Sequence, residues 1–470
     1  MIKSLFLSCL ISFSFLCYGD NQTEETSPIL PSDHLPFQVR LETADFSLPV
    51  GLQTYAYGTY KNKCLLITGR VNGLHDFSNT NDNFPPNKQN TTVFVIDFAK
   101  KKTYSRSLLS KSAHLTQEEV DTLSVTAAEF KQVGNTLYVV GGYGVDTDSG
   151  NFSTKSTLTA IDIPGLIHWV CHPSKKESAK KHIRQTSHPI LQVTGGALHQ
   201  LNPHTPFLLI FGQNFPGFYL DSSNGFYTNQ VRCFNLIDNG KDLFIIPGKQ
   251  WPQDPNYRRR DLNIVPIIEK NKTSYDQSFL ALSGVFTLSS GIWTVPVFIN
   301  SAGDSFMPNP SKKSTFKQGM TNYNSAHIEL FSKKTNDMHT LILGGLSYIA
   351  LENDVFVEDS EIPFSNSLTD IRIDSHGHIA QYLMKNQYPV ILSTSSNPGN
   401  PLLFGAGAQF IKVDGLPTFP NGVFSLDDLH EEETLLGYVV GGIQSTVPNT
   451  TLFTDSAASP HIFKVILERQ

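Results

Sequence analysis

The stretch TLYVVGGYG, residues 136–144, is an apolar run that contains two adjacent glycines. A short continuous apolar run is typical of a strand buried on both faces, and glycines at its end permit a positive φ where the chain leaves the sheet. The pattern therefore predicts a buried strand that ends in a turn. Five other stretches repeat it: CLLITGR at 64–70, LLIFGQ at 208–213, FLALSGV at 279–285, TLILGGLS at 340–347 and GYVVGGIQ at 437–444.

Each apolar strand belongs to a longer unit with a constant order of strands. A strand rich in small residues precedes it, as in SVTAAEF at 124–130, and an alternating strand such as TTVFVIDF at 91–98 follows it. A fourth stretch, for example KTYSRSL at 102–108 or LIHWVCH at 166–172, closes most units. Four antiparallel strands per unit, repeated six times, predict an all-β fold, a six-bladed β-propeller. The expected blades are 47–110, 120–175, 188–248, 260–308, 320–385 and 400–470.

The two ends of the chain predict how the ring closes. The last unit stops at its third strand, in HIFKVILERQ at 461–470, whereas FQVRLETADF at 37–46 is an alternating strand with no blade of its own. We expect residues 37–46 to complete the last blade beside residues 461–467, because this closure removes an exposed edge. The propeller domain is therefore expected to span residues 37–470.

The double glycine after a buried strand resembles the kelch repeat, and the resemblance covers the chain from about residue 47 to its end. Intact pairs occur at 141–142, 344–345 and 441–442, while the other units keep one glycine. The aromatic pair that kelch repeats carry further on is reduced to Trp169 and Trp293. The resemblance implies a propeller but no particular function, because adaptors, oxidases and epimerases share that fold.

The N-terminus has the order of segments found in secretory signal peptides. In MIKSLFLSCLISFSFLCYGD, a lysine precedes a short apolar stretch, and small residues follow it. We expect residues 1–19 to be a signal peptide, residues 20–36 a linker, and the protein to be secreted, periplasmic or associated with the cell envelope. A retained or lipidated anchor is the alternative. No later segment has the roughly twenty consecutive apolar residues of a membrane span.

Charge and composition limit the partners and cofactors. The formal net charge of −6 argues against nucleic-acid binding, which needs a basic face. The cysteines left after cleavage, Cys64, Cys171 and Cys233, are widely spaced and are expected to be buried free thiols. Asp146-x-Asp148 and His376-x-His378 are weak metal signals, so no metal and no cofactor is expected. We also expect a monomer.

Long connections between the second and third strands are predicted to emerge together on one face, the long-loop face. In blades one and three they run over about 70–90 and 213–227. Their aromatic residues either pack the loops against one another or line a funnel for a polar ligand. These residues are Phe77, Phe84, Phe215, Phe218, Tyr219, Phe226, Tyr227 and Tyr348, accompanied by the amides Asn72, Asn79 and Asn224.

The stretch QDPNYRRRDLNIVPI, residues 253–267, brings charge to a first strand where other units have small residues. Unpaired charges are costly to bury, so the arginines and the aspartate either form an internal pair or face a ligand at the channel mouth. On the second interpretation, residues on other first strands join them. The candidate ligand-binding residues are Arg259, Arg260, Asp261, Asn263, Tyr55, Tyr323 and His327.

The function expected from these features is a binding or protein-interaction module. Its ligand, a protein or a carbohydrate, is expected on the long-loop face around the central channel. The alternative is a cofactor-independent carbohydrate-active enzyme of the sugar epimerase or lyase type, and a structural envelope protein comes third. Titratable groups that face each other in the channel with shifted pKa values would favour the enzyme.

Overall fold

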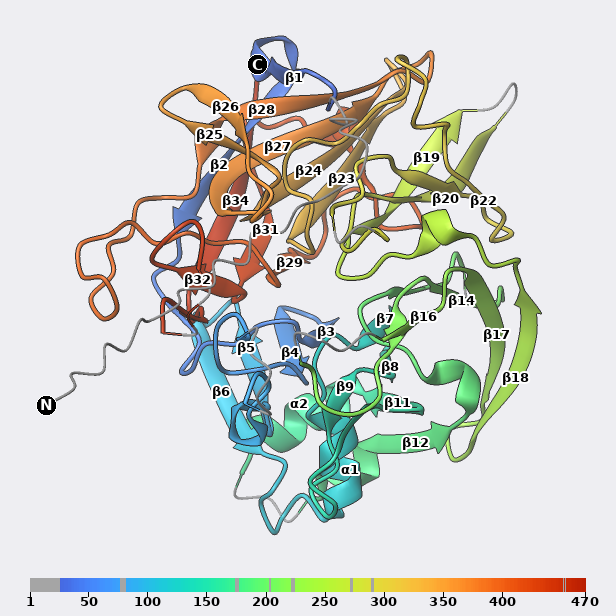
Figure 1. The fold of residues 1–470 in the computed structure, drawn as a ribbon. Coiled ribbons are helices and arrows are strands. Elements are labelled where there is room, and N and C mark those ends of the chain that lie inside the picture. Colours follow the sequence, from blue (N-terminus) through green and yellow to red (C-terminus); the bar gives the residue numbers. More distant parts are fainter. Residues whose placement is uncertain are drawn as a thin grey trace, which may run out of the picture.

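Antiparallel sheets follow one another around a common centre in chain order (Figure 1). The computed structural model describes residues 26–470 apart from 77–81, 174–176, 203, 221–224, 271–273, 289–290, 451 and 453. The expected signal peptide, together with Phe77, Asn79 and Asn224, lies outside the described residues.

Three sheets form the first half of the ring, each with its strands in chain order from the centre outward. The first contains β3 (Ala56–Tyr60), β4 (Lys63–Ile67), β5 (Thr92–Asp97) and β6 (Lys102–Ser107). The second contains β7 (Glu129–Val133), β8 (Thr136–Val140), β11 (Thr157–Asp162) and β12 (Ile183–Ser187). The third contains β13 (Ala197–His199), β14 (Phe207–Ile210), β17 (Val231–Asp238) and β18 (Leu243–Gln250).

Three further sheets form the second half. The fourth contains β19 (Ile264–Lys270), β20 (Tyr275–Ala281), β21 (Val297–Ile299) and β22 (Ser305–Phe306). The fifth contains β23 (His327–Ser332), β24 (Asp337–Leu346), β27 (Phe364–Ile373) and β28 (Ile379–Gln387), with β30 (Phe424–Ser425) and β1 (Ile29–Pro31) at its edges. The sixth contains β29 (Gln409–Lys412), β31 (Glu433–Val440), β34 (Ile462–Arg469) and β2 (Phe37–Thr43).

The expected fold class, an all-β propeller, is confirmed, but the strand count differs from the prediction. Within the described residues, five sheets have the four strands of a blade and one has six strands. The count of four-stranded blades is therefore five, not the expected six. The fifth sheet is larger because β1 pairs parallel with β28 and β30 pairs parallel with β23. Part of the expected linker 20–36 is thus a sheet strand.

The first and last parts of the described chain meet in one sheet. Strand β2 pairs antiparallel with β34, from Phe37 opposite Arg469 to Thr43 opposite Phe463. Alternate residues of β2, including Val39 and Leu41, are buried in the core between the fifth and sixth sheets. The pairing predicted for this segment is therefore present.

Short inter-sheet hydrogen bonds, which we call the axial circle, join the residues that lead into the innermost strands. Several of these residues, such as Thr54, Ala127 and Asp261, have a positive φ, which turns the chain into the strand. The bonds connect each innermost strand to the next. They run from Gly195 N to Ala127 O (3.0 Å), Asp261 N to Gly195 O (2.7 Å), Asn324 N to Asp261 O (2.9 Å), Gly407 N to Asn324 O (2.9 Å) and Thr54 N to Gly407 O (3.0 Å), with 2.6 Å between the hydroxyls of Thr54 and Thr126.

The second sheet corrects one expected strand. The stretch 166–172 belongs to the helix α2 (Ile163–Cys171), and the fourth strand is β12, which lies outside the expected blade 120–175. Proline stands near the start of α2, and Leu166, Trp169 and Val170 recur at helical spacing and are buried against the first sheet. The helical spacing of these apolar residues is the signal that the repeat comparison missed. A shorter helix, α1 (Gln117–Leu123), precedes β7.

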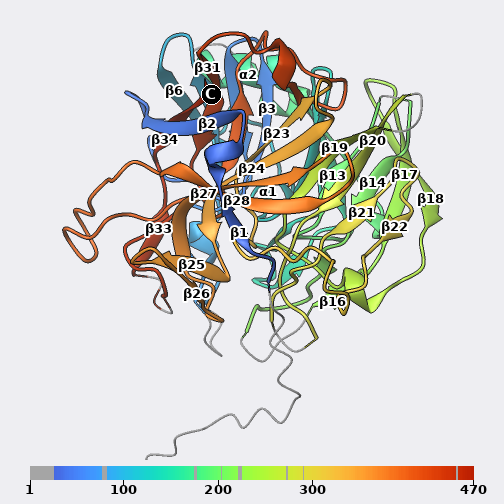
Figure 2. The ribbon, with the colours of Figure 1, turned by 90° about the horizontal axis from the view of Figure 1, so that it is seen from above.

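Short hairpins extend the connections between second and third strands. They are β9 (Tyr143–Val145) with β10 (Phe152–Thr154), β15 (Gln213–Asn214) with β16 (Phe226–Tyr227), β25 (Ile349–Glu352) with β26 (Val355–Glu358), and β32 (Ile443–Ser445) with β33 (Ser456–Ala458). Figure 2 shows β16, β25, β26 and β33 on the same side of the molecule. The expectation that the long connections share one face is met for these elements.

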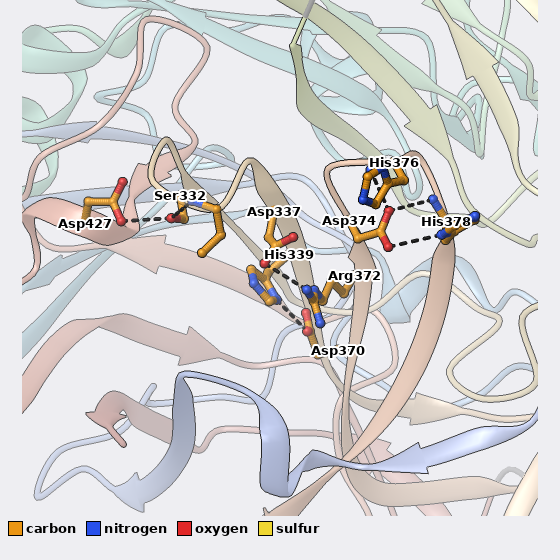
Figure 3. A network of polar contacts seen from close by, with 10 residues as sticks. Ser332, Asp337, His339, Asp370, Arg372, Asp374, His376, His378 and Asp427 are labelled. Carbon is orange, nitrogen blue, oxygen red and sulfur yellow. Dashed lines mark hydrogen bonds and ion pairs between the residues drawn. The ribbon is translucent and has the colours of Figure 1, made fainter.

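A buried polar pair joins two strands inside the fifth sheet (Figure 3). His339 on β24 and Asp370 on β27 are both fully buried, with 2.7 Å between Nδ1 and Oδ2. Arg372 donates to Asp337 across the same two strands at 3.0 Å. The ring of Phe37 on β2 meets the His339 ring edge-on at 5.1 Å. The pair therefore lies where the fifth and sixth sheets meet.

Candidate functional site

A cavity of about 500 Å³ lies at the centre of the ring, and we call it the channel cavity. Every one of the innermost strands β3, β7, β13, β19, β23 and β29 contributes to its wall. The wall begins at the residues of the axial circle and continues along the innermost strands from their first residues. Among the lining residues are Tyr57, Glu129, Lys131, His199, His327, Glu329 and Lys412.

Glu129 and Lys131 stand two residues apart on β7, so their side chains leave the same face of the strand. Burial raises the pKa of Glu129 to about 8, and Arg232 and the Gly196 N–H act in the opposite direction. Glu129 Oε1 accepts from Gly196 N at 3.0 Å, while Oε2 is buried without a hydrogen bond. Burial lowers the pKa of Lys131, and the charge of Lys412 lowers it further. The cavity therefore contains ionisable groups with shifted pKa values.

A histidine and a glutamate form a second such group on β23. His327 Nδ1 and Glu329 Oε1 are hydrogen-bonded. Burial acts to lower the pKa of His327, but the Glu329 carboxylate outweighs it and the pKa is raised. On β13, His199 is different: burial lowers its pKa to about 3, and its Nε2 lies 3.0 Å from the Ile264 carbonyl oxygen. His327 is thus the histidine suited to carry a proton at this site.

Six of the seven candidate residues from the sequence line one or both of two cavities. Tyr55, Asn263 and His327 line the channel cavity, and Arg260 and Tyr323 line a smaller cavity of about 80 Å³ at the long-loop face, the loop-face cavity. Asp261 lines both, because it lies at the axial circle between them.

Three of the candidates have contacts that hold the protein together. Arg259 lines neither cavity: it is fully buried, donates to Asn256 O at 3.0 Å and Ser283 O at 3.1 Å, and stacks on Trp293. Tyr55 Oη donates to Val440 O at 2.8 Å, and Asn263 Oδ1 accepts from Ser325 N at 3.0 Å. These contacts connect neighbouring sheets or segments of the chain.

Arg260 and Asp261 form the internal pair that was one of the two interpretations. The Arg260 Nε lies 3.2 Å from Asp261 Oδ2, and Arg260 Nη2 donates to Tyr219 Oη at 2.9 Å. Burial raises the pKa of Asp261, and Arg260 acts in the opposite direction. The pair partly satisfies a buried charge, and the loop-face cavity leaves little room beside it.

The aromatic residues of the long loops pack against one another at the long-loop face. Tyr143 lies with its ring centroid 5.4 Å from Phe84 and 5.6 Å from Phe215, and Phe215 lies 5.1 Å from Tyr219. Phe218 joins the same cluster. Phe226 is 71% exposed, and Tyr227 stacks under Arg258. For the described rings other than Phe226, packing of the loops is the interpretation that agrees with these contacts.

Sequence reasoning missed Glu129, Lys131, Glu329 and Lys412. The available signal was alternation: Glu129-x-Lys131 and His327-x-Glu329 place charges two apart on strands that were considered only for their small residues. In the folded protein both pairs line the channel cavity. A search of the first strands for charges two residues apart would therefore have found the groups that line this cavity.

The weak metal signals gain no support. Among the described residues, no group of three or more His, Cys, Asp or Glu side chains is arranged to hold a metal ion. His378 contacts Asp374 in a hairpin turn, with the His376 ring 6.1 Å away (Figure 3). Asp146 accepts from Ser149 in another turn. Cys64, Cys171 and Cys233 are free thiols. In the part of the chain that is described, no helix is long and apolar enough to cross a bilayer.

Fold and cavity together define an all-β propeller with a polar cavity on its axis. No family model matches the chain, and no curated protein does, so kelch-repeat membership is not confirmed. Among solved structures, one titled "Structure of YjhT" matches over 90% of this chain and 99% of that chain, at 9% sequence identity and a TM-score of 0.46. At that similarity no function and no site residue is carried over to this chain.

Proposed function

We propose that this protein is a binding module that takes a small polar ligand, such as a carbohydrate or a short peptide, into the channel cavity. The observation that carries the proposal is the cavity itself: about 500 Å³, with polar side chains from five of the six innermost strands around it and Asp261 and Asn263 just before the other one, β19. Ligand sites are typically of 300–1,000 Å³ with a few convergent polar groups. Lys412 is exposed at one edge of the cavity, which supports entry from the side of the tight turns.

We infer further that the ring has six blades, with the six-stranded sheet acting as one of them and the pairing of β2 with β34 closing it. The axial circle supports this inference, because its hydrogen bonds join the residues that precede all six innermost strands. The double glycines support a place among kelch-type propellers. We also propose export and a monomeric state, the first supported by residues 1–19 of the sequence and both testable by mass spectrometry and gel filtration of the secreted protein.

The binding proposal is tested by closing the cavity. Ala197 lines it, so Ala197→Tyr fills part of it, and Ala302→Tyr adds the same ring at an exposed turn as a control. The protein is screened against glycans and short peptides, and affinities are measured by calorimetry. We expect at least a tenfold loss of affinity in Ala197→Tyr and none in Ala302→Tyr, with both proteins folded by circular dichroism. Equal affinities in the two variants would place the ligand elsewhere.

The second candidate is a cofactor-independent carbohydrate-active enzyme, of the epimerase or lyase type. The observation that favours it is the presence of Glu129, Lys131 and His327 in one cavity, each with a shifted pKa, as general acid and base groups require. Glu129→Gln keeps the shape of the side chain and removes the carboxyl group that could give or take a proton. If the protein is an enzyme, this variant binds its sugar with similar affinity and turns it over at least a hundredfold more slowly. A sugar that binds but is never converted by the wild-type protein would favour the module.

A further inference from the structure

Two lysines of the channel cavity have no partner of their own. Lys131 on β7 and Lys412 on β29 both line this cavity, and neither ammonium group has a hydrogen bond or an ion pair with any described residue. They come from the second and sixth sheets, which flank the first sheet on either side. Lys131 is half-buried, so its charge is poorly solvated as well as unpaired.

The two ammonium groups are close enough to influence each other. The charge of Lys412 contributes to the lowered pKa of Lys131, after burial itself. Lys412 is exposed at the edge of the cavity, whereas Lys131 is half-buried in it. The two like charges repel each other, and an anion placed between them would offset that repulsion.

The nearest carboxylates do not neutralise this pair. Glu329 also acts on Lys131, but its Oε1 is hydrogen-bonded to His327 on the same strand. Glu129, two residues from Lys131, has one oxygen bonded to Gly196 and is held largely in its neutral form near pH 7 by burial. A neutral carboxyl group donates a hydrogen bond to an oxygen of a ligand and does not repel an anion.

We propose that Lys131 and Lys412 form an anion subsite of the channel cavity, which selects small ligands bearing a carboxylate or a phosphate group. The inference rests on the proposed binding function and names the chemical class of its ligand. The anion lies between the two ammonium groups, and the neutral part of the ligand extends along the polar wall of Tyr57, Asn263 and His327.

The test compares sugars that share the glucose ring and differ in the group at C6, which is neutral in one and anionic in the others. Glucose, glucuronate and glucose 6-phosphate are titrated into the full-length mature protein at low and at moderate salt, with inorganic phosphate as a fourth probe. We expect at least one anionic sugar to bind at least tenfold more tightly than glucose, with an affinity that falls as salt rises. Glucuronate and glucose 6-phosphate together distinguish a carboxylate subsite from a phosphate subsite.

Matched variants assign the preference to the two lysines. Lys131→Met and Lys412→Met are each expected to reduce the preference for the anion to less than threefold, Lys131→Arg to retain it, and Lys313→Met, at an exposed loop, to leave it unchanged. Preference that survives both methionine variants overturns the subsite, as does the absence of binding by every anionic probe. If a neutral ligand still binds in a manner sensitive to Ala197→Tyr, the subsite is wrong and the binding function stands. If binding is insensitive to Ala197→Tyr, the binding function itself is wrong.

Discussion

The two ends of the central channel differ although the same strands form both. At the long-loop face, aromatic rings and the axial circle leave about 80 Å³ of space, whereas the cavity on the side of the tight turns measures about 500 Å³. The first end is filled by loops that are long and rich in aromatic residues. The second end is bounded by the innermost strands and by Asn421, Gly422 and Phe424 of the connection between β29 and β31, and this wall leaves the larger space.

This difference shows that loop length alone is a poor guide to a binding face in this fold. A long loop must pack its own apolar residues somewhere, and here several of them meet over the axis. The connection between β29 and β31, which lines the channel cavity, is also long, yet it leaves that cavity open. The variants below test this contrast, from the largest expected effect to the smallest.

The largest effect, a loss of stability, is expected at the long-loop face. Phe215 is 2% exposed and contacts Tyr143 and Tyr219, so Phe215→Ala leaves a void and should lower the free energy of unfolding by about 3–5 kcal/mol. Phe226, which is 71% exposed, is the matched control, and Phe226→Ala should cost less than about 0.5 kcal/mol. Denaturant unfolding measures both. Equal costs would mean that the rings over the axis do not form a packed core.

The next effect is the pH dependence of stability that Glu129 causes in the channel cavity. The pKa of Glu129 is about 8 in the folded protein against an ordinary value of 4.5, so the folded state holds a proton that the unfolded state loses between these values. Its contribution to stability is fully present below pH 4.5 and is lost as pH rises to about 8, with a slope of up to about 1.4 kcal/mol per pH unit. Glu129→Gln should flatten this part of the curve. Parallel curves for the two proteins, measured by denaturant unfolding at pH 5, 6 and 7, would contradict the assignment.

A smaller loss of stability is expected at the axial circle, where the two ends of the channel meet. Asp261 has a φ of 50° and pairs with the buried Arg260, so Asp261→Ala loses the pair and strains the backbone. We expect a cost of about 2–3 kcal/mol for alanine and about half of that for Asp261→Asn, because asparagine tolerates this conformation. Thermal and denaturant unfolding of the ligand-free protein give both numbers. If asparagine were as costly as alanine, the ion pair would dominate and the backbone would contribute little.

The smallest effect has the opposite sign. Lys131→Met removes a poorly solvated charge that Lys412 opposes, so the ligand-free protein should become more stable, by up to about 1 kcal/mol. Residues kept for a ligand at the expense of stability behave in this way. Destabilisation by this substitution, seen as a lower denaturant midpoint than in Lys313→Met, would mean that Lys131 supports the fold.

Much of the fold could be predicted because the buried strands repeat one local pattern. The six apolar runs form β4, β8, β14, β20, β24 and β31, and the glycines that end them, such as Gly69 and Gly142, have a positive φ. The pairing of residues 37–43 with the last strand could also be predicted, from an unpaired strand at each end. Helix α2 could not be predicted from the repeat, because residues 166–172 were assigned as a strand by analogy with the other units. That assignment left the helical spacing of the apolar residues in this segment out of account.

The site was harder to predict, for two physical reasons. Strand alternation separates Arg260 from Asp261, but the positive φ at Asp261 breaks that alternation and lets neighbouring side chains pair. The aromatic loops are compatible with both a funnel and a packed core, and only tertiary packing decides between the two. The choice between the two ends of the channel therefore depended on contacts that no local stretch of sequence encodes.

The pairing of β2 with β34 has a consequence for how the molecule reaches its native state. Phe37 and Arg469 are neighbours in the sheet but roughly 430 residues apart along the chain, and contacts of such long range slow folding. Residues 37–43 also pack against the fifth sheet, so their apolar side can be covered in part before the final strand emerges. Their pairing within the sixth sheet is completed only when β34 has been made, which leaves the edge of β34's partner strand unpaired until the end of synthesis.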